Sequence, residues 1–322
     1  MTYAIAVLFV AQVLVPVVLI VSLWRGSLAG RPPTKASWLA GVLGSGAYVS
    51  YFLLAGRWDW VGYYLRVALL VAFLLALYAS FRRTFGGDEK VPWWRSPGSL
   101  NGWFSLAANA ALALFFGCLI VLAARGFVHG DQRAAELSFP LEGGIYYVGQ
   151  GGNSPLLNHH NVVPAQRFAL DVTRLNPAGT RAFGVYPSDP SRYAIFGEGI
   201  RSPCGGEVVE ATDGQPDHRP RGTDRENPAG NHVVVRCAEE GVEPNVDVVV
   251  AHMKQGSVAV ERGERVGEGQ LLGRVGNSGN TTEPHLHVHA VKVGTGSVLE
   301  GEGAPIRFEG RLLVRNDLVI LW

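Results

Sequence analysis

The sequence is poor in cysteine and in charged residues. Only three of its 322 residues are cysteines, and no Cys-x-x-Cys pair occurs, which argues against a cysteine zinc site. Charged residues make up 17% of the chain, the formal net charge is +1, and no basic stripe with aromatic spacing is present. Nucleic-acid binding therefore has no support. The sequence also lacks long internal repeats and low-complexity tracts.

Within the first 125 residues, charged residues lie almost entirely between long apolar stretches. Four apolar stretches follow one another there, with Arg66 as the one charge among them: residues 1–24, 36–56, 60–81 and 96–124. About 20 apolar residues span a bilayer as a helix, so we predict a four-helix transmembrane region over residues 1–125. The first stretch has neither a basic start nor an obvious small-residue cleavage site, unlike a cleaved signal peptide.

Basic residues are unevenly distributed between these stretches. The second connection has a single basic residue, Arg57, beside Asp59, whereas the first and third connections hold Arg25, Arg31, Lys35, Arg82, Arg83, Lys90 and Arg95. Positively charged loops stay in the cytoplasm. We therefore expect a multi-pass membrane protein whose amino terminus and C-terminal domain both lie outside the cytoplasm.

The composition changes after the fourth apolar stretch. A short polar linker over residues 126–139 leads into a glycine-rich, valine-rich domain over residues 140–322. Interleaved glycines and turn signals such as Asp213-Gly214 predict a mainly antiparallel β domain. The charge-rich stretch from Gly214 to Gly230 is interpreted as a loop inserted between two strands.

The three cysteines divide by location. Cys118 lies in the fourth apolar stretch and is interpreted as a small packing residue. Cys204 and Cys237 lie in the outward domain, on either side of the inserted loop, where an oxidising compartment permits a disulfide. We expect these two to be bridged, closing a loop of about 34 residues.

A short segment of the C-terminal domain carries alternating histidines. Side chains repeat with period two along a strand, so His285, His287 and His289 would share one face while Leu286 and Val288 enter a core. Neutral imidazole is a preferred zinc ligand, and an unligated neighbour can move protons. A surface strand that happens to be rich in histidine is the alternative interpretation.

Further landmarks, in order along the chain, make residues 144–322 resemble the lysostaphin-type (LytM-like) zinc metallopeptidases, which cut peptide cross-links in bacterial cell walls. These landmarks are Asn158-His159-His160, Gln166-Arg167-Phe168-Ala169-Leu170-Asp171, Ser202-Pro203-Cys204-Gly205-Gly206-Glu207-Val208, Gly230-Asn231-His232, Ala251-His252 and Pro284-His285-Leu286-His287.

The resemblance implies a role for each of five residues. His160, Asp171 and His287 would hold one Zn²⁺ and leave the fourth tetrahedral position open, as in catalytic zinc sites. His252 and His285 would remain unligated, deprotonate the attacking water and stabilise the oxyanion. An ordinary strand-edge carboxylate at Asp171 and a satisfied buried histidine at 252 are the alternative explanations.

The first motif departs from the familiar family pattern. His160 and Asp171 are eleven residues apart instead of four, which fits a variant with a long loop. His159 is therefore an alternative first ligand, although on an extended segment it would point away from the site. His289 is expected to be a non-ligating neighbour of His287 on the same face.

Together, the resemblance and the distribution of apolar and basic residues predict a zinc metalloendopeptidase anchored in a bacterial inner membrane, with its peptidase domain extracytoplasmic and peptidoglycan peptides as its substrate. Two other functions remain open on the sequence. One is a zinc peptidase that acts on a secreted protein or peptide, and the other is a catalytically silent regulator of another cell-wall hydrolase.

Overall fold

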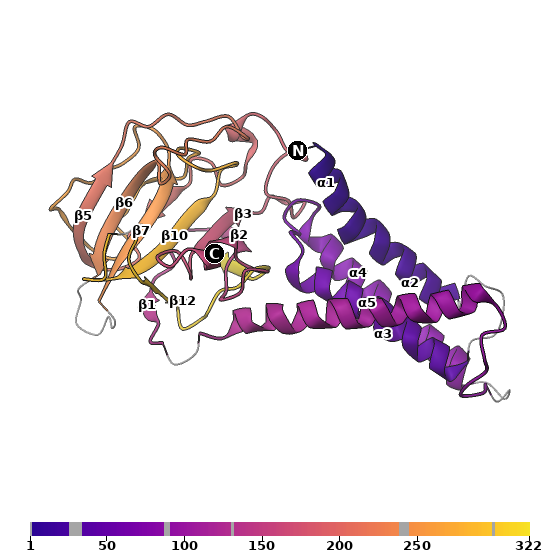
Figure 1. The fold of residues 1–322 in the computed structure, drawn as a ribbon. Helices are drawn as coiled ribbons and strands as arrows, with labels where there is room; N and C mark the ends of the chain where they lie inside the picture. Colours follow the sequence, from indigo (N-terminus) through magenta and orange to yellow (C-terminus); the bar gives the residue numbers. More distant parts are fainter. Residues whose placement is uncertain (1, 26–33, 87–90, 130–131, 238–244, 298–299) are drawn as a thin grey trace. The chain divides into compact units, whose positions relative to one another are not determined.

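The structure is a computed structural model that describes residues 2–25, 34–86, 91–129, 132–237, 245–297 and 300–322. The described chain divides into two compact units, Met1–Ala123 and Ala124–Trp322 (Figure 1). The division into a membrane region ending at residue 125, a linker ending at residue 139 and a C-terminal domain stays a prediction. Each unit is described by itself.

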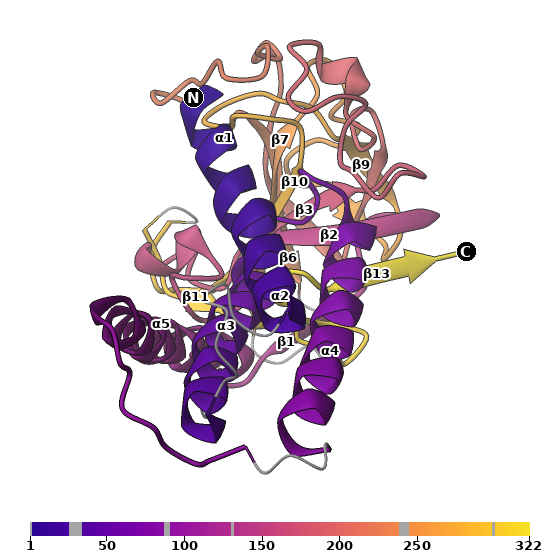
Figure 2. The ribbon, with the colours of Figure 1, turned by 90° about the vertical axis from the view of Figure 1, so that its right-hand side faces the viewer.

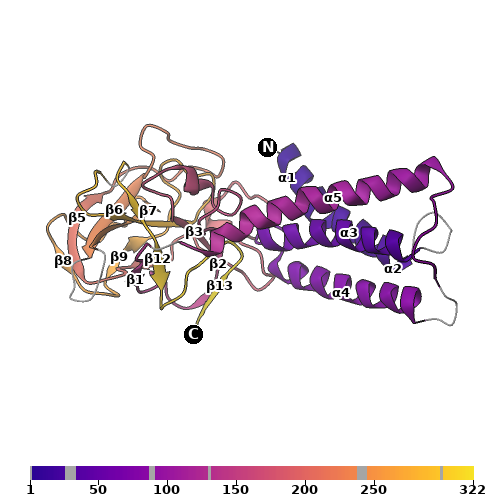
Figure 3. The ribbon, with the colours of Figure 1, turned by 60° about the horizontal axis from the view of Figure 1, so that its bottom comes forward.

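The regular secondary structure described in the first unit is helical, and four helical segments are long and apolar enough to cross a membrane. Four candidate spans cover Ala6–Arg25, Lys35–Ala55, Tyr63–Phe85 and Leu100–Phe127. Within this unit α2 contacts both α3 and α4, and Figure 3 shows these helices side by side. The helices are α1 (Thr2–Phe9), η1 (Val10–Leu14), α2 (Val15–Arg25), α3 (Lys35–Ala55), α4 (Tyr63–Phe85) and α5 (Leu100–Ala124).

The first span contains one π-helical turn, η1, between α1 and α2, which continue in one line (Figure 2). Pro16 lies just after this turn, and because proline lacks an N–H group and crowds the preceding turn, regular α-helical hydrogen bonding is interrupted there. The buried Gln12 side chain exchanges two hydrogen bonds with the backbone of Arg57, in the connection between α3 and α4. A polar residue inside an apolar span is thereby satisfied.

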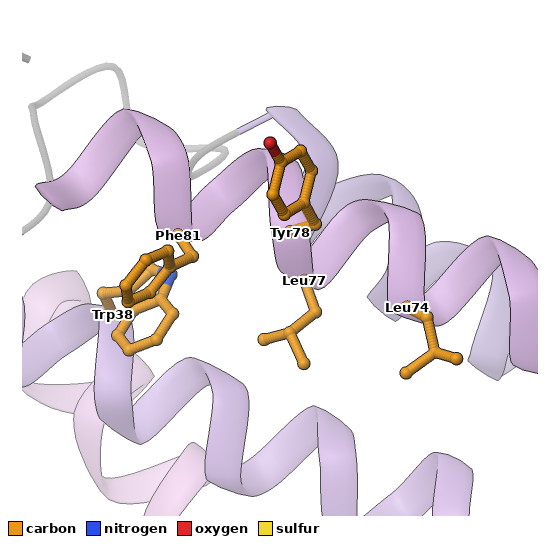
Figure 4. Close-up of a pocket in the computed structure, with 5 residues that line it drawn as sticks. All are labelled: Trp38, Leu74, Leu77, Tyr78 and Phe81. Carbon is orange, nitrogen blue, oxygen red and sulfur yellow. The ribbon is translucent and has the colours of Figure 1, made fainter. Parts of the chain in front are cut away.

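Helices α3 and α4 border a shallow apolar groove of about 400 Å³ (Figure 4). Trp38 lies at one end, where its indole N–H donates a 3.1 Å hydrogen bond to the hydroxyl of Ser80. The remaining lining residues come from α4: Leu74, Leu77, Tyr78 and Phe81.

The second unit is built on a nine-stranded sheet whose described ladders are all antiparallel (Figure 1). The order is β13-β2-β3-β10-β7-β6-β5-β8, and β11 also pairs with β10. The strands are β2 (Gly144–Gln150), β3 (Leu170–Arg174), β5 (Gly206–Thr212), β6 (Asn231–Cys237), β7 (Val246–Met253), β8 (Arg265–Val266), β10 (Leu286–Lys292), β11 (Gly303–Ala304) and β13 (Leu318–Leu321).

Two small pairs of strands complete the unit. One is antiparallel, between β4 (Gly199–Arg201) and β9 (Leu271–Arg274), and the other is parallel, between β1 (Ala135–Leu137) and β12 (Ile306–Phe308). Residues 135–137 fall within the predicted linker and form a strand of this unit. The predicted class, a helical membrane-type region followed by a mainly antiparallel β domain, is confirmed.

The sheet separates an apolar core from the face that carries the histidines. Leu286, Val288 and Ala290 of β10 enter the main core. His287 and His289 alternate with them and therefore lie on the opposite face. That face has its own small apolar cluster, formed by Val234, Val249 and Ala251.

The predicted disulfide is present. Cys204 and Cys237 are bridged with their Cα atoms 5.8 Å apart, and Gly206 pairs with Cys237 in the β5–β6 ladder. The bridge thus joins the beginning of β5 to the end of β6. Between these strands, residues 213–230 form the long loop expected from their composition.

Candidate metal centre

Strand register brings four of the predicted site residues together. In the antiparallel ladders, His287 of β10 lies directly opposite Asp171 of β3 and opposite Ala251 of β7. His252 is the next residue of β7, and His285 immediately precedes β10. Neighbouring strands lie about 4.8 Å apart, so three strands can place their side chains around one small volume.

Asp171 is the residue on which the imidazoles converge. Its Oδ1 atom lies 3.0 Å from His160 Nε2, 3.0 Å from His287 Nδ1 and 3.4 Å from His285 Nε2. Burial by itself would raise the pKa of Asp171, but the adjacent His160 and His285 rings overcome this and hold that pKa well below its usual range. The carboxylate is therefore ionised, as a metal ligand must be.

His160 is held by its own loop. It belongs to η3 (His159–Val162), a 3-10 turn whose cap, the buried Asn158, accepts a hydrogen bond from the His160 backbone N–H. The His160 Nδ1–H donates to Gln166 Oε1 at 3.1 Å. With its proton on Nδ1, the ring would have its Nε2 lone pair available as a metal ligand, 3.0 Å from Asp171 Oδ1.

The expectation that His159 points away from His160 is wrong. The two ring centroids are only 3.9 Å apart, and ligand atoms of His159, His160 and Asp171 lie within 4.8 Å of one another. The reason is local, because the segment is a 3-10 turn and not an extended strand, so successive side chains are not opposed.

His252 and His285 are each oriented by a backbone carbonyl. The His252 Nδ1–H donates to the oxygen of Ser278 at 2.9 Å, and the His285 Nδ1–H donates to the oxygen of Glu283 at 2.8 Å. Their ring centroids are 5.0 Å apart. Neither histidine uses its Nε2 atom for these contacts, and the Nε2 atom of His285 faces Asp171 Oδ1 at 3.4 Å.

The pKa values of these two rings shift in opposite directions. Burial and the neighbouring His285 and His287 hold the pKa of His252 well below its usual value. Burial also acts to lower the pKa of His285, but the Asp171 carboxylate outweighs it and raises that pKa. The backbone of His252 is strained, because this residue has a left-handed φ of 60°.

The turn that precedes His285 is fixed by buried contacts. Glu283 forms an ion pair with the buried Arg181, at 2.7 Å between Oε2 and Nε. The hydroxyl of Thr281 donates to the Glu283 carbonyl oxygen at 2.9 Å, the same oxygen that orients His285. Behind the turn, a side chain at Gly230 would collide with the backbone of Ser278 at 2.4 Å.

His287 has a neighbour on each of its ring nitrogens. Nδ1 faces Asp171 Oδ1, and Nε2 lies 3.0 Å from Nδ1 of His289. Both histidines are at most 3% exposed. Burial lowers the pKa of His287 to about 3, against the opposing hydrogen bond to Asp171, so this ring is neutral.

The donor atoms fit a metal ion. Two groups of potential ligands lie within the described residues, one formed by His159, His160 and Asp171 and the other by His252, His285 and His287. The predicted ligands come from both groups, linked by the Asp171–His287 contact. Two ligand atoms on one tetrahedral zinc lie about 3.4 Å apart, given bonds of about 2.0 to 2.2 Å, and the contacts of Asp171 agree to within a few tenths of an ångström.

Comparison with protein families identifies the peptidase part of the chain. The family model described as Peptidase family M23 matches residues 193–298. These residues are a lysostaphin-type M23 domain. The predicted family, a family of zinc metallopeptidases, is thus confirmed. The match to the M23 domain includes His252, His285 and His287, whereas His160 and Asp171 precede it.

Solved structures of peptidases are also similar to the chain, at low identity. A peptidase M23 from Pseudomonas aeruginosa is 19% identical, covering 55% of this chain and 54% of that one, with a TM-score of 0.27. Lysostaphin from Staphylococcus simulans is 19% identical over 38% of this chain and 45% of its own, with a TM-score of 0.23. A zinc-containing peptidase from Vibrio cholerae is 20% identical over 38% and 46%, with a TM-score of 0.23.

The chain therefore spans about half the length of each of these structures. A search of curated proteins found no match.

Several residues that position the site were not assigned a role from the sequence. Gln166 orients His160, and the carbonyls of Ser278 and Glu283 orient His252 and His285. Gln166 belongs to the Gln166–Asp171 motif, so the sequence indicated this residue, but it did not indicate the hydrogen bond to His160. The two carbonyls carry no side-chain signal, because any residue supplies the same group.

Proposed function

We propose that this protein is a membrane-anchored zinc endopeptidase that hydrolyses peptide bonds in peptidoglycan cross-links or stem peptides. The observation that carries the proposal is the convergence of imidazole nitrogens on Asp171 Oδ1, at 3.0, 3.0 and 3.4 Å. A purely structural carboxylate has no need of three histidine neighbours. Membership of the M23 family supports the reaction class.

In this proposal His160, Asp171 and His287 hold the metal. They provide two imidazoles and one carboxylate, a set typical of catalytic zinc sites. Zinc would supply a Lewis acid that polarises the scissile carbonyl and makes water nucleophilic at neutral pH. A hydrogen bond outside the site supports this assignment. Gln166 holds Nδ1 of His160, which leaves the Nε2 lone pair of that ring for the metal.

His252 and His285 act on the reacting groups. Each uses Nδ1–H to hold a backbone carbonyl. The pKa of His252 is lowered, so its Nε2 is a proton acceptor, whereas the pKa of His285 is raised by Asp171, so its Nε2 is the better proton donor. One such nitrogen takes the proton of the attacking water, and a ring that has gained a proton donates a hydrogen bond to the oxyanion. The carbonyl contacts keep both rings oriented throughout these steps.

Peptidoglycan is the proposed substrate because of where the domain would lie. Four helices could span a membrane, and the basic residues of the first and third connections favour an orientation with the C-terminal domain outside the cytoplasm. An outward M23 domain would meet wall peptides.

The test is digestion of defined muropeptides by the full-length protein in detergent micelles, with products analysed by mass. Cleavage at a cross-link or stem peptide bond, abolished in a His287→Ala variant, is the expected result. A zinc-loaded protein that cleaves only secreted protein substrates would overturn the proposed substrate. Absence of any peptide cleavage by zinc-loaded protein would overturn the proposed enzyme and favour a regulatory role.

A further inference from the structure

His289 is a buried histidine that the proposed mechanism does not use. It lies two residues beyond His287 on β10, on the same face of the sheet, and is 1% exposed. In the ladder with β7 it lies opposite Val249, which belongs to the small apolar cluster on that face. The contact to His287 gives this buried imidazole a polar neighbour, with 3.0 Å between His287 Nε2 and His289 Nδ1.

The contact determines which nitrogen of His287 can be a ligand. A neutral imidazole carries one proton, so a ring that binds a metal through Nδ1 must carry its proton on Nε2. In His287 the Nδ1 atom faces Asp171, while Nε2 lies 3.0 Å from His289 Nδ1. A buried Nε2–H group without an acceptor would cost about 1 to 3 kcal/mol.

We infer that His289 is a positioning residue for the metal centre, accepting a hydrogen bond from His287 Nε2–H and so directing the His287 Nδ1 lone pair toward the metal. For this, His289 must itself carry its proton on Nε2, with Nδ1 as acceptor. The inference rests on the proposed function, since it assumes that His287 is a ligand.

The arrangement parallels that of the other imidazole ligand. His160 donates its Nδ1–H to Gln166 and directs Nε2 at the site, whereas His287 uses the two nitrogens in the reverse order. Each ligand ring therefore has a separate partner on the nitrogen that faces away from Asp171. Outer partners of this kind fix the orientation and proton position of a ligating histidine.

The test compares two substitutions of His289 by their effect on zinc affinity. Asparagine places its Oδ1 atom near the position of His289 Nδ1, so His289→Asn keeps an acceptor, whereas His289→Leu removes it. Zinc dissociation constants would be measured for full-length protein in detergent, by competition with a chromophoric chelator. We expect His289→Leu to weaken zinc binding about 10- to 100-fold and His289→Asn to stay within about threefold of the wild type.

A matched variant separates the hydrogen bond from packing. Val249→Ala trims the buried side chain opposite His289 and should lower the unfolding midpoint while leaving zinc affinity within about threefold. Equal zinc affinity in His289→Leu and the wild type would overturn the inference. So would equal losses in the Leu and Asn variants, because then packing and not the acceptor matters.

The experiment also separates this inference from the proposed function. If the wild-type protein binds zinc and His289→Leu binds it equally well, the metal centre stands and only the role of His289 is overturned. If the wild-type protein binds no zinc, both are overturned.

Discussion

Asp171 Oδ1 lies 3.0 Å from Nδ1 of His287, the residue directly opposite it in the β3–β10 ladder. The two residues are far apart in the sequence, and the ladder register is what brings them together. Substitution of His287 by alanine removes an imidazole that no described neighbour on β10 can replace without a change of register.

We therefore predict that His287→Ala loses zinc and peptidase activity together. Elemental analysis of the purified full-length variant, alongside its rate of peptide cleavage, is the measurement. His232→Ala is a suitable control, because that histidine is engaged by Gly230 and Glu210 and has no contact with the ligands among the described interactions. Full zinc occupancy in the His287 variant would contradict the assignment.

The first ligand can be tested by comparing adjacent residues. His160 has Nε2 3.0 Å from Asp171 and Nδ1 held by Gln166, whereas His159 is the more exposed ring, tilted beside it with 3.9 Å between the ring centroids. We expect His160→Ala to lose zinc and His159→Ala to retain it, as determined by elemental analysis. The reverse result would exchange the two residues and leave the other ligands unchanged.

Changes at His252 or His285 should separate turnover from metal binding. Both rings are held by backbone carbonyls and are assigned to the reacting groups, so replacement by alanine should preserve zinc content. We expect kcat to fall by about two to four orders of magnitude. Near-normal kcat in both variants, with zinc retained, would show that these histidines are structural neighbours.

The disulfide should contribute stability more than metal affinity. Cys204 and Cys237 close a loop with a sequence separation of 33 residues. Cys204 lies just before β5 and Cys237 ends β6, and both are remote in sequence from the ligands. Replacement of both by serine should lower the free energy of unfolding by about 3 to 4 kcal/mol, measured with urea. Cys118→Ser is the control. Free, alkylatable thiols at both positions in exported protein would contradict the pairing.

Membrane orientation is testable with reporter fusions. The basic residues of the first and third connections predict that fusions after Leu28 and Gly87 report a cytoplasmic location and that a fusion after Gly130 reports an outside location. All three fusion points lie outside the described residues. A cytoplasmic signal after Gly130 would contradict both the orientation and the proposed wall substrate.

Much of this molecule could be predicted from periodicity and composition. The four helices followed from uncharged stretches of span length, and the shared face of His285, His287 and His289 followed from strand alternation. The Cys204–Cys237 pairing followed from a charge-rich loop between two strands, because ends of neighbouring strands lie close together.

Other features depend on contacts that the sequence does not encode locally. His159 was expected to face away because an extended backbone was assumed, and a 3-10 turn capped by Asn158 reversed this. The pairing of β1 with β12 joins segments about half the chain apart, and no local pattern indicates it. Likewise, the 3.0 Å contact between His287 and His289 depends on ring orientation, which alternation along a strand leaves open.

The central claim is that His160, Asp171 and His287 together hold one zinc ion. Anomalous diffraction at the zinc absorption edge, from crystals of the zinc-loaded protein, tests this most directly. The account predicts one peak within about 2.0 to 2.2 Å of His160 Nε2, His287 Nδ1 and an Asp171 carboxylate oxygen. A peak bound instead by His252, His285 and His287, or no peak near Asp171, would contradict it.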